Sequence, residues 1–347
     1  MPHPVMAADL TARHATVLSS LNGALLSMME ADERVVIIGE DLLDPYGGAF
    51  KVTRRLSTRF PDRVLTTPIS EAAIVGVSVG MALRGRRPIA ELMFGDFTAL
   101  AADQLINHAA KFRWMYNDAV TVPVVVRAPM GGRRGYGPTH SQSLEKHFLG
   151  VPGLWVVAPH VLADPGALLK QSVEFEQPVL FVESKTCYAR PLESPLPGFT
   201  LKSYADDEHP FATTAMYAPA DTADATIFCY GGMVPVALEA ARILTSDEGL
   251  SVDLLVLAQL SPCPVTHLQR LLADRRPSIC VYAEEGTRTG GWGAELLAQI
   301  DELSSGSTRL THRRVSAADT PIASSRELEA IALPQPQSIV DAVLSCL

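Results

Sequence analysis

The sequence predicts a two-domain α/β protein in which parallel sheets are covered by helices on both faces. The chain has 347 residues, more than a single hydrophobic core usually supports. Short apolar runs alternate with segments of helical periodicity along most of the chain. The apolar runs contain too few polar residues for a sheet with a solvated face, which is typical of strands buried on both sides.

The first part of the chain, residues 1–185, is expected to form the first domain. Apolar residues at helical spacing, such as Val17 and Leu21, predict its first helix, and VVIIG predicts its first strand. The expected helices cover 15–31, 71–84, 97–115 and 162–174, and the expected strands cover 35–39, 87–93, 122–127, 154–159 and 178–183. In the helix over 71–84, Gly76 and Gly80 lie on one face. Glycine is costly inside a helix, so we expect this face to pack closely against another helix.

Residues 186–222 differ in character from the rest of the chain. They contain five prolines, several acidic residues and little periodicity, so we expect an interdomain linker. A second α/β domain is expected over 223–347. Its expected strands cover 225–230, 251–257 and 278–285, and its expected helices cover 233–245 and 292–303.

Composition argues against several classes of protein. The formal net charge is −9, and no basic block is longer than two residues, which argues against a nucleic-acid-binding protein. The N-terminus lacks the basic-then-apolar pattern of a signal peptide. No apolar run reaches the length of about 18–20 residues that spans a bilayer. We therefore expect a soluble, cytoplasmic protein with no membrane contact.

The five cysteines are scattered and form no CxxC pair, which indicates reduced thiols. Cys263 and His267 lie close together in CPVTH, but no second pair accompanies them. A structural zinc site needs four ligands, so we expect this chain to hold no metal of its own.

The loop GGRRGYGPTHSQS, at 131–143, has three interpretations. Its glycines and basic residues are compatible with a phosphate-binding loop, but neither GxxxxGK[ST] nor GxGxxG is present. A nucleophile elbow would need G-x-S-x-G around Ser141 or Ser143, and that pattern is absent too. The third interpretation is a flexible loop that presents His140, although a loop histidine is more often an ordinary surface residue.

Three further residues have both a structural and a functional interpretation. Glu71 in TPISEAAIVG suits the first turn of a helix capped by Ser70. That structural interpretation is favoured for the residue taken alone, and the functional one is a buried carboxyl that shares a proton with a ligand. Phe97 in MFGDF is compatible with an ordinary core position, and Glu40 in GED with a strand-to-loop turn.

The order and spacing of these motifs resemble one family. The motifs are GEDLLDPYGGAFKVT (39–53), TPISEAAIVGVSVGMALRGRRPIAELMFGDF (67–97), DQLINHAAKFRWM (103–115), GGRRGYGPTHSQSLE (131–145) and PGLWVVAP (152–159). The chain resembles the beta subunit of the thiamine-diphosphate-dependent 2-oxo acid dehydrogenase component, of the pyruvate, branched-chain or acetoin type. The match is close over about 35–185. It resumes at AEEGTRTGGWGAEL (283–296) and ALPQPQSIVDAV (332–343).

This resemblance implies an architecture and a set of partners. It implies a transketolase-like pyrimidine-binding domain followed by a domain like the transketolase C-terminal domain. In the family the diphosphate and Mg²⁺ are held by a GDG motif of the alpha subunit, and this chain has no GDG. The chain is therefore expected to hold half of the thiamine diphosphate. The expected assembly has two alpha and two beta chains and serves a lipoyl acyltransferase core.

The resemblance also assigns roles to individual residues. Glu71 matches the glutamate that faces the cofactor pyrimidine and shares a proton with its ring nitrogen. Phe97 matches the aromatic residue stacked on that ring, and Ile69 lies at its edge. Glu40 matches an acidic residue below the ring that relays protons. His140 matches the beta-chain histidine at the mouth of the site, so the loop would present a catalytic histidine.

The implied function is decarboxylation of a small 2-oxo acid and transfer of the acyl group to a lipoyl domain. An alternative keeps the cofactor but makes the protein part of an acetoin-cleaving or carboligating enzyme of specialised biosynthesis. A third hypothesis is a non-catalytic assembly subunit.

Several positions depart from the family pattern. Thr139 stands where Gln is common, and Phe175 where an Asp is common near the family's potassium site. A K⁺ site held by backbone carbonyls stays open. The stretches 256–264 and 323–330 also differ, the latter (ASSRELEA) replacing an aromatic-proline run.

Overall fold

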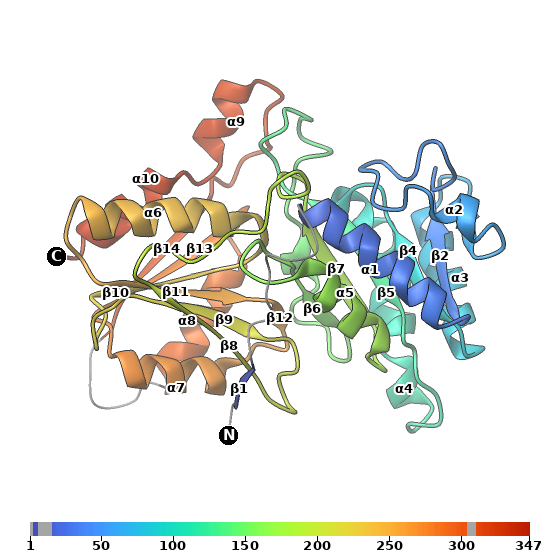
Figure 1. Cartoon of the computed structure of the whole chain (residues 1–347), viewed down its shortest axis with the longest axis horizontal. Coiled ribbons are helices and arrows are strands. Elements are labelled where there is room, and N and C mark those ends of the chain that lie inside the picture. The colour runs from blue at the N-terminus through green and yellow to red at the C-terminus, as the bar shows by residue number, and fades with distance from the viewer. Residues whose placement is uncertain (1–2, 6–15, 304–309) are drawn as a thin grey trace.

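The computed structural model describes residues 3–5, 16–303 and 310–347. The chain forms two α/β halves that lie side by side, each built around a seven-stranded sheet (Figure 1). This arrangement confirms the predicted α/β class with two largely parallel sheets.

The first sheet carries most of the residues singled out by sequence. Its strand order is β12 (Gln259–Ser261), β6 (Trp155–Val157), β7 (Val179–Ser184), β5 (Val125–Met130), β4 (Arg87–Glu91), β2 (Val35–Gly39) and β3 (Val64–Thr66). Its strands run parallel except at one edge, where β12 pairs antiparallel with β6. Because β12 comes from the second part of the sequence, the two halves share this sheet.

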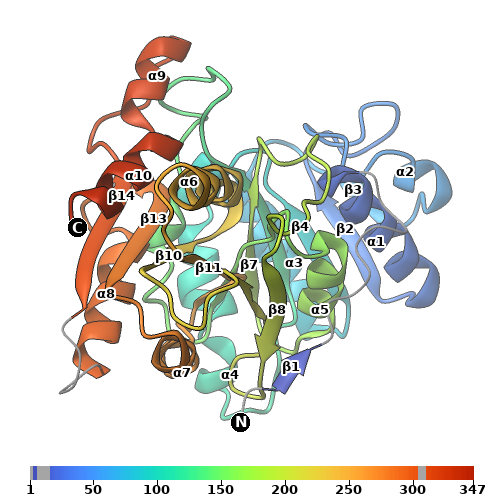
Figure 2. The same ribbon diagram turned by 60° about the vertical axis from the view of Figure 1, so that its left-hand side comes forward.

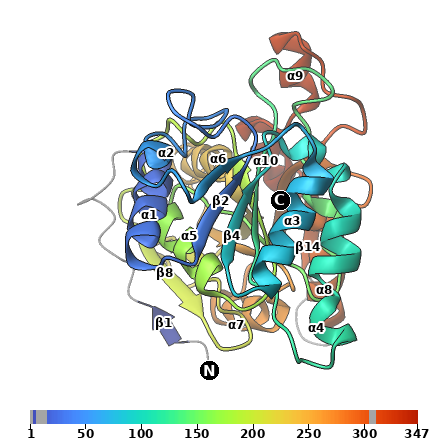
Figure 3. The same ribbon diagram turned by 90° about the vertical axis from the view of Figure 1, so that its right-hand side faces the viewer.

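Helices cover both faces of the first sheet, as its apolar strands require. They are α1 (Val17–Ala31), α2 (Leu56–Arg59), α3 (Glu71–Leu83) and α5 (Pro165–Glu174). Figure 3 shows β2 and β4 between α1 on one side and α3 on the other. The apolar side chains of α1 belong to one buried cluster and those of α3 to a second, and strands β2, β4 and β5 contribute side chains to both.

The second sheet combines a parallel part with an antiparallel part. Its order is β1 (His3–Val5), β8 (Thr200–Ala205), β9 (Thr213–Tyr217), β11 (Val252–Leu257), β10 (Ala225–Cys229), β13 (Ile279–Thr287) and β14 (Thr311–Ala317). The surrounding helices are α6 (Val234–Ser246), α7 (Val265–Arg275), α8 (Trp292–Leu303), α9 (Arg326–Ala332) and α10 (Pro336–Leu344). In Figure 2, α6 and α10 lie on one face of this sheet and α7 and α8 on the other.

The expected linker contains regular structure. Within 186–222, β8 and β9 pair antiparallel with each other, and β9 pairs with β11 of the second sheet. Side chains of β8 alternate between exposed and half-buried, but the strand is only six residues long. Because several prolines lie near β8 in the sequence, this segment is easily taken for irregular structure.

The single long helix expected over 97–115 is wrong. The segment contains a 3-10 turn, η1 (Gly95–Ala99), a π-helical stretch, η2 (Gln104–Ala109), and the short α4 (Phe112–Met115). The Ala110 N–H bonds the carbonyl of Leu105 at 3.0 Å, five residues back, so the helix is locally widened. By contrast, the helices predicted at 15–31 and 71–84 are confirmed within two residues at each end.

Across the residues that the structure describes, no helix has both the length and the apolar character needed to cross a bilayer.

Candidate active site

Two buried carboxyl groups lie at the carboxyl edge of the first sheet. Glu40 follows directly after β2, and Glu71 is the first residue of α3. Their side chains are 6% and 4% exposed. A Cβ on Gly39 would come within 2.5 Å of the Glu91 carbonyl, so only glycine allows β2 to end this close to β4. The sheet therefore delivers Glu40 into a packed interior.

The two carboxyl groups influence each other. Burial raises the pKa of Glu40 above its ordinary value, and the nearby charges of Glu71 and Asp41 raise it further. Glu40 Oε1 is buried without a hydrogen-bond partner. A buried carboxyl oxygen without a partner is costly, so Glu40, with the charge of Glu71 nearby, is suited to a ligand that brings its own donor.

Ser70 does not cap helix α3 through its side chain. It occupies the N-cap position, but its hydroxyl makes no capping hydrogen bond, so that part of the structural interpretation of Glu71 is wrong. Ile69, one residue earlier, is 81% exposed, an unusual position for a large apolar side chain. The carboxyl pair thus adjoins an uncovered apolar surface.

An aromatic cluster surrounds His140. The ring of His140 meets Phe94 and Phe97 edge to face, with centroid distances of 4.7 and 5.2 Å. Phe97 lies in η1, and Phe94 immediately precedes it. A Cβ on Gly95, between them, would lie 2.1 Å from Met130 Cγ, so glycine is needed there. The structure therefore brings together Phe97 and His140, which are 43 residues apart in the sequence.

The imidazole of His140 also has a polar neighbour. Its Nδ1 lies 2.9 Å from the hydroxyl of Thr139, the residue that departs from the family pattern. The His140 carbonyl accepts a hydrogen bond from the ammonium of Lys185. Lys185 is fully buried, and burial lowers its pKa to about 8. Its ammonium also lies over the ring of Phe94, at 5.1 Å from the centroid.

The Gly-rich start of the loop is not free to bind phosphate. The N–H groups of Gly132, Arg133 and Gly135 donate to the carboxylates of Glu285 and Glu329, over 2.6–3.0 Å. These acceptors come from β13 and α9 of the second half, and Figure 1 shows α9 standing beside this loop. Internal carboxylates therefore occupy the anion-binding positions, which leaves the interpretation of a loop that presents His140.

Beneath the site lies a buried ion network. The guanidinium of Arg127 in β5 donates to Glu183 over two hydrogen bonds of 2.8 Å and to Glu91 over one of 2.5 Å. Tyr188 donates its hydroxyl to Glu183 as well. Burial raises the pKa of Glu91, while Arg127 acts in the opposite direction. The network ties β4, β5 and β7 together below the aromatic cluster.

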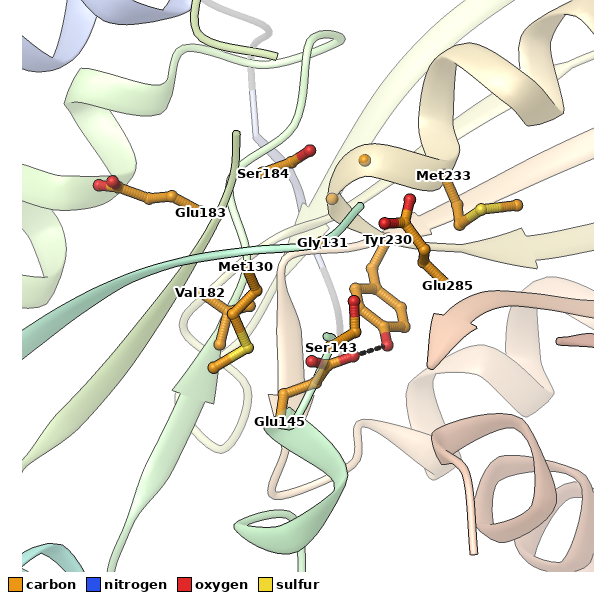
Figure 4. Close-up of a pocket in the computed structure, with 12 residues that line it drawn as sticks. Met130, Gly131, Ser143, Glu145, Val182, Glu183, Ser184, Tyr230, Met233 and Glu285 are labelled. Carbon is orange, nitrogen blue, oxygen red and sulfur yellow. Dashed lines mark hydrogen bonds between the residues drawn. The ribbon is translucent and has the colours of Figure 1, made fainter. Parts of the chain in front are cut away.

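A small cavity of about 30 Å³ lies between the halves. Figure 4 shows Glu145 and Tyr230 joined by a hydrogen bond beside it, with Glu285 opposite. Burial raises the pKa of Glu145 to about 7, and the charges of Glu284 and Glu285 add to that effect. Within the described ranges, no three or more His, Cys, Asp or Glu side chains are grouped so that they could hold a metal ion.

Sequence reasoning missed four residues that support this site. Phe94 lies within the quoted motif MFGDF but was not singled out, and Lys185 follows a strand without any local signal. Glu285 and Glu329 contact the loop across 153 and 196 residues of sequence. No spacing pattern reports contacts of that range.

The chain matches two family descriptions that together cover most of its length. Residues 14–191 match "Transketolase, pyrimidine binding domain", and residues 217–339 match "Transketolase, C-terminal domain". A solved structure titled "Split gene transketolase, inactive beta4 tetramer" has a TM-score of 0.72, covering 96% of this chain and 98% of that chain. At 21% identity, this likeness concerns the fold alone.

Curated relatives are similar over nearly the whole chain. "Pyruvate dehydrogenase E1 component subunit beta-1, mitochondrial" of Oryza sativa subsp. japonica is 35% identical over 95% of this chain and 86% of its own length. "3-methyl-2-oxobutanoate dehydrogenase subunit beta" of Mycobacterium tuberculosis is 34% identical, covering 98% and 93%. "Acetoin:2,6-dichlorophenolindophenol oxidoreductase subunit beta" of Cupriavidus necator is 33% identical, covering 95% and 97%.

Proposed function

The chain belongs to the transketolase-like family of 2-oxo acid dehydrogenase beta subunits, and from this we propose that it is the beta subunit of a heteromeric, thiamine-diphosphate-dependent 2-oxo acid dehydrogenase. With an alpha subunit, it decarboxylates a small 2-oxo acid and transfers the acyl group to a lipoyl domain. The observation that carries this proposal is the pair of buried carboxyl groups, Glu40 and Glu71, of which Glu40 Oε1 has no hydrogen-bond partner.

These residues fit an aminopyrimidine ring. Such a ring has a nitrogen that accepts a hydrogen bond and an amino group that donates one. A buried carboxyl that is protonated part of the time can donate to the ring nitrogen or accept from the amino group. The pKa of Glu40 is already raised by its burial, which suits proton exchange. Phe97 adds an aromatic surface for stacking, and the exposed Ile69 adds an apolar edge.

Bound thiamine diphosphate supplies a nucleophilic carbon and an electron sink for the decarboxylation. Glu71 would hold the pyrimidine nitrogen through a shared proton, and Glu40 would relay protons below the ring. His140, held between Phe94 and Phe97, orients the 2-oxo acid or the lipoyl sulfur and passes a proton to it. An imidazole is suited to that step because its ordinary pKa lies near neutrality.

An uncovered apolar surface supports an alpha partner. On α3, Val77 is 49% exposed, and a Cβ on Gly80 would meet nothing within 4 Å. The expected close packing of Gly76 is met within the chain by Gln104 of η2, because a Cβ on Gly76 would lie 3.1 Å from Gln104 Oε1, but the Gly80 side is open. Leu100 and Trp114 extend this surface, with 60% and 89% exposure.

We further propose that the alpha chain holds Mg²⁺ and the diphosphate, in an assembly of two alpha and two beta chains on an acyltransferase core. The division at 1–185, 186–222 and 223–347 stays part of this proposal, as does a cytoplasmic location. For potassium, the Phe175 ring packs against Trp155 with a centroid distance of 4.8 Å and offers no ligand, and we propose backbone carbonyls near 172–177 as ligands.

A second candidate is an acetoin-cleaving or carboligating enzyme. The acetoin relative is 33% identical and the pyruvate relative 35%, so identity does not separate the two reactions. Formation or cleavage of an acyloin without lipoamide would favour this candidate. A purely structural subunit is the third, and it requires normal thiamine diphosphate affinity after Glu71 and Phe97 are both replaced by Ala.

The test uses this chain co-expressed with an alpha subunit and supplied with thiamine diphosphate and Mg²⁺. Decarboxylation of pyruvate and of branched 2-oxo acids is followed with an artificial electron acceptor. We expect turnover of one acid, and we expect Glu71→Gln to abolish it without affecting assembly, because the amide cannot exchange the proton. Unimpaired turnover in Glu71→Gln would refute the assigned role.

A further inference from the structure

Glu329 of α9 binds the loop of His140 from the opposite half of the molecule. Its Oε1 accepts the N–H of Arg133 at 2.7 Å, and its Oε2 accepts the N–H of Gly135 at 3.0 Å. The Glu329 side chain is 2% exposed. Both carboxylate oxygens are thus used by backbone donors of one short segment, as an anion is bound in a backbone nest.

The contact between the loop and the α9 region is close. A Cβ on Gly132 would lie 2.9 Å from Glu329 Oε1 and 2.8 Å from Leu333 Cδ1. A Cβ on Gly137 would lie 2.5 Å from Ser324 Oγ, and its φ of +79° also favours glycine. Glycines at these positions therefore let the loop settle against 324–333.

Both halves hold the loop. The backbone of residues 132–135 donates to Glu285 and Glu329 of the second half, and the Arg134 side chain donates to the Lys185 carbonyl of the first half. The His140 carbonyl is held by Lys185, which follows β7 of the first half. The position of the His140 ring therefore depends on the contacts that the loop makes with both halves.

We propose that Glu329 is a positioning residue, which fixes the loop 131–143 and thereby sets His140 over the cofactor. The proposal rests on the proposed function for its catalytic consequence, but not for its structural part. The divergent segment 323–330 would then contribute to the active site in addition to any role in assembly.

The geometry of the nest favours a carboxylate. The N–H groups of Arg133 and Gly135 point to different oxygens of Glu329, and a Gln amide has an oxygen at only one of these two positions. The Glu329→Gln amide would place its own N–H₂ against the N–H of Arg133 or Gly135. Glu327→Gln is a matched control on the same helix, because Glu327 is exposed and accepts a hydrogen bond from the Ser325 hydroxyl.

The rate of trypsin cleavage in the loop measures how well the loop is ordered. Trypsin cleaves after Arg133 and Arg134, and cleavage requires the loop to leave the nest. In the assembled alpha–beta complex, we expect Glu329→Gln to speed this cleavage roughly tenfold, the effect of losing one hydrogen bond to a charged group. Glu327→Gln should leave the rate unchanged. An unchanged rate in Glu329→Gln would overturn the proposal.

Turnover and rescue separate positioning from simple stability. We expect kcat to fall roughly tenfold in Glu329→Gln, with KM and thiamine diphosphate affinity near wild type. In Glu329→Ala, added acetate should enter the nest and restore both protection from trypsin and part of kcat. Faster cleavage with unchanged kcat would overturn the positioning role.

Glu329→Asp provides a second test in case the Glu329→Gln complex does not assemble. Glu329→Asp keeps both acceptors but withdraws them by one methylene, and an intermediate cleavage rate is expected. A wild-type rate in Glu329→Asp and Glu329→Ala would overturn the proposal. If the wild-type complex neither binds thiamine diphosphate nor turns over, the proposed function fails, while the trypsin comparison still decides whether Glu329 orders the loop.

Discussion

At the scale of single residues, buried acids distinguish this molecule. Glu40, Glu71, Glu145 and Glu329 are each at most 6% exposed. Glu329 accepts hydrogen bonds from two backbone N–H groups, whereas Glu145 Oε1 accepts one from the hydroxyl of Tyr230. Burial raises the pKa of both Glu40 and Glu145.

Glu145 should make stability depend on pH. Burial raises its folded pKa to about 7 from an ordinary 4.5. Between these values the folded chain keeps a proton that the unfolded chain has released, so stability falls as pH rises through this window. The Gln side chain of Glu145→Gln is neutral at every pH. The variant should therefore gain almost no free energy of unfolding over wild type at pH 4.5. Above pH 7 this gain should approach an upper bound on the order of 3 kcal/mol.

The measurement is urea denaturation of wild type and Glu145→Gln at pH 5 and pH 8. Glu174→Gln, at an exposed position of α5, serves as the control and should show little change at either pH. An equal effect of Glu145→Gln at both pH values would contradict a buried, proton-holding Glu145.

Local sequence signals located several site residues but not their support. Glu71 begins a helix and Glu40 follows a strand, as their neighbours in sequence indicate. The roles of these residues, and of Ile69, Phe97 and His140, remain predictions. Lys185, Glu285 and Glu329 were missed because they act through contacts distant in sequence, which composition and spacing do not record.

At the scale of elements, strands with strong apolar patterns were predicted better than segments with tertiary constraints. The strand VVIIG is fully buried and appears as expected. The segment 97–115 has good helical periodicity, but packing of Gln104 against Gly76 accompanies a π turn that no propensity reports. β8 and β9 were missed because each depends on pairing with a neighbour within the second sheet.

Arg127 should be essential for holding the central strands together. Arg127→Met leaves Glu91 and Glu183 buried without their shared cation, and removal of one partner from a buried ion network costs about 3–5 kcal/mol. Denaturation in urea should show that loss. Arg242→Met removes an exposed pair with Glu239 and should change the stability little. Equal losses in the two variants would contradict the network's role.

At the scale of the whole molecule, the halves are interlocked. β12 crosses from the second half into the first sheet, and Glu285 and Glu329 reach back to the loop of His140. The sequence predicts two domains but not this exchange, because the edge strand β12 has only three residues. The exposed surface around α3 also has no partner within the described chain, since Gly80 faces open space.

The central claim is that this chain holds one half of a thiamine diphosphate site. The measurement that tests it most directly is calorimetric titration of thiamine diphosphate and Mg²⁺ into the chain alone, the alpha subunit alone and their complex. We expect saturable, tight binding by the complex and not by either isolated chain, and we expect Phe97→Ala to weaken it. Binding by the isolated chain as tight as that of the complex would contradict it.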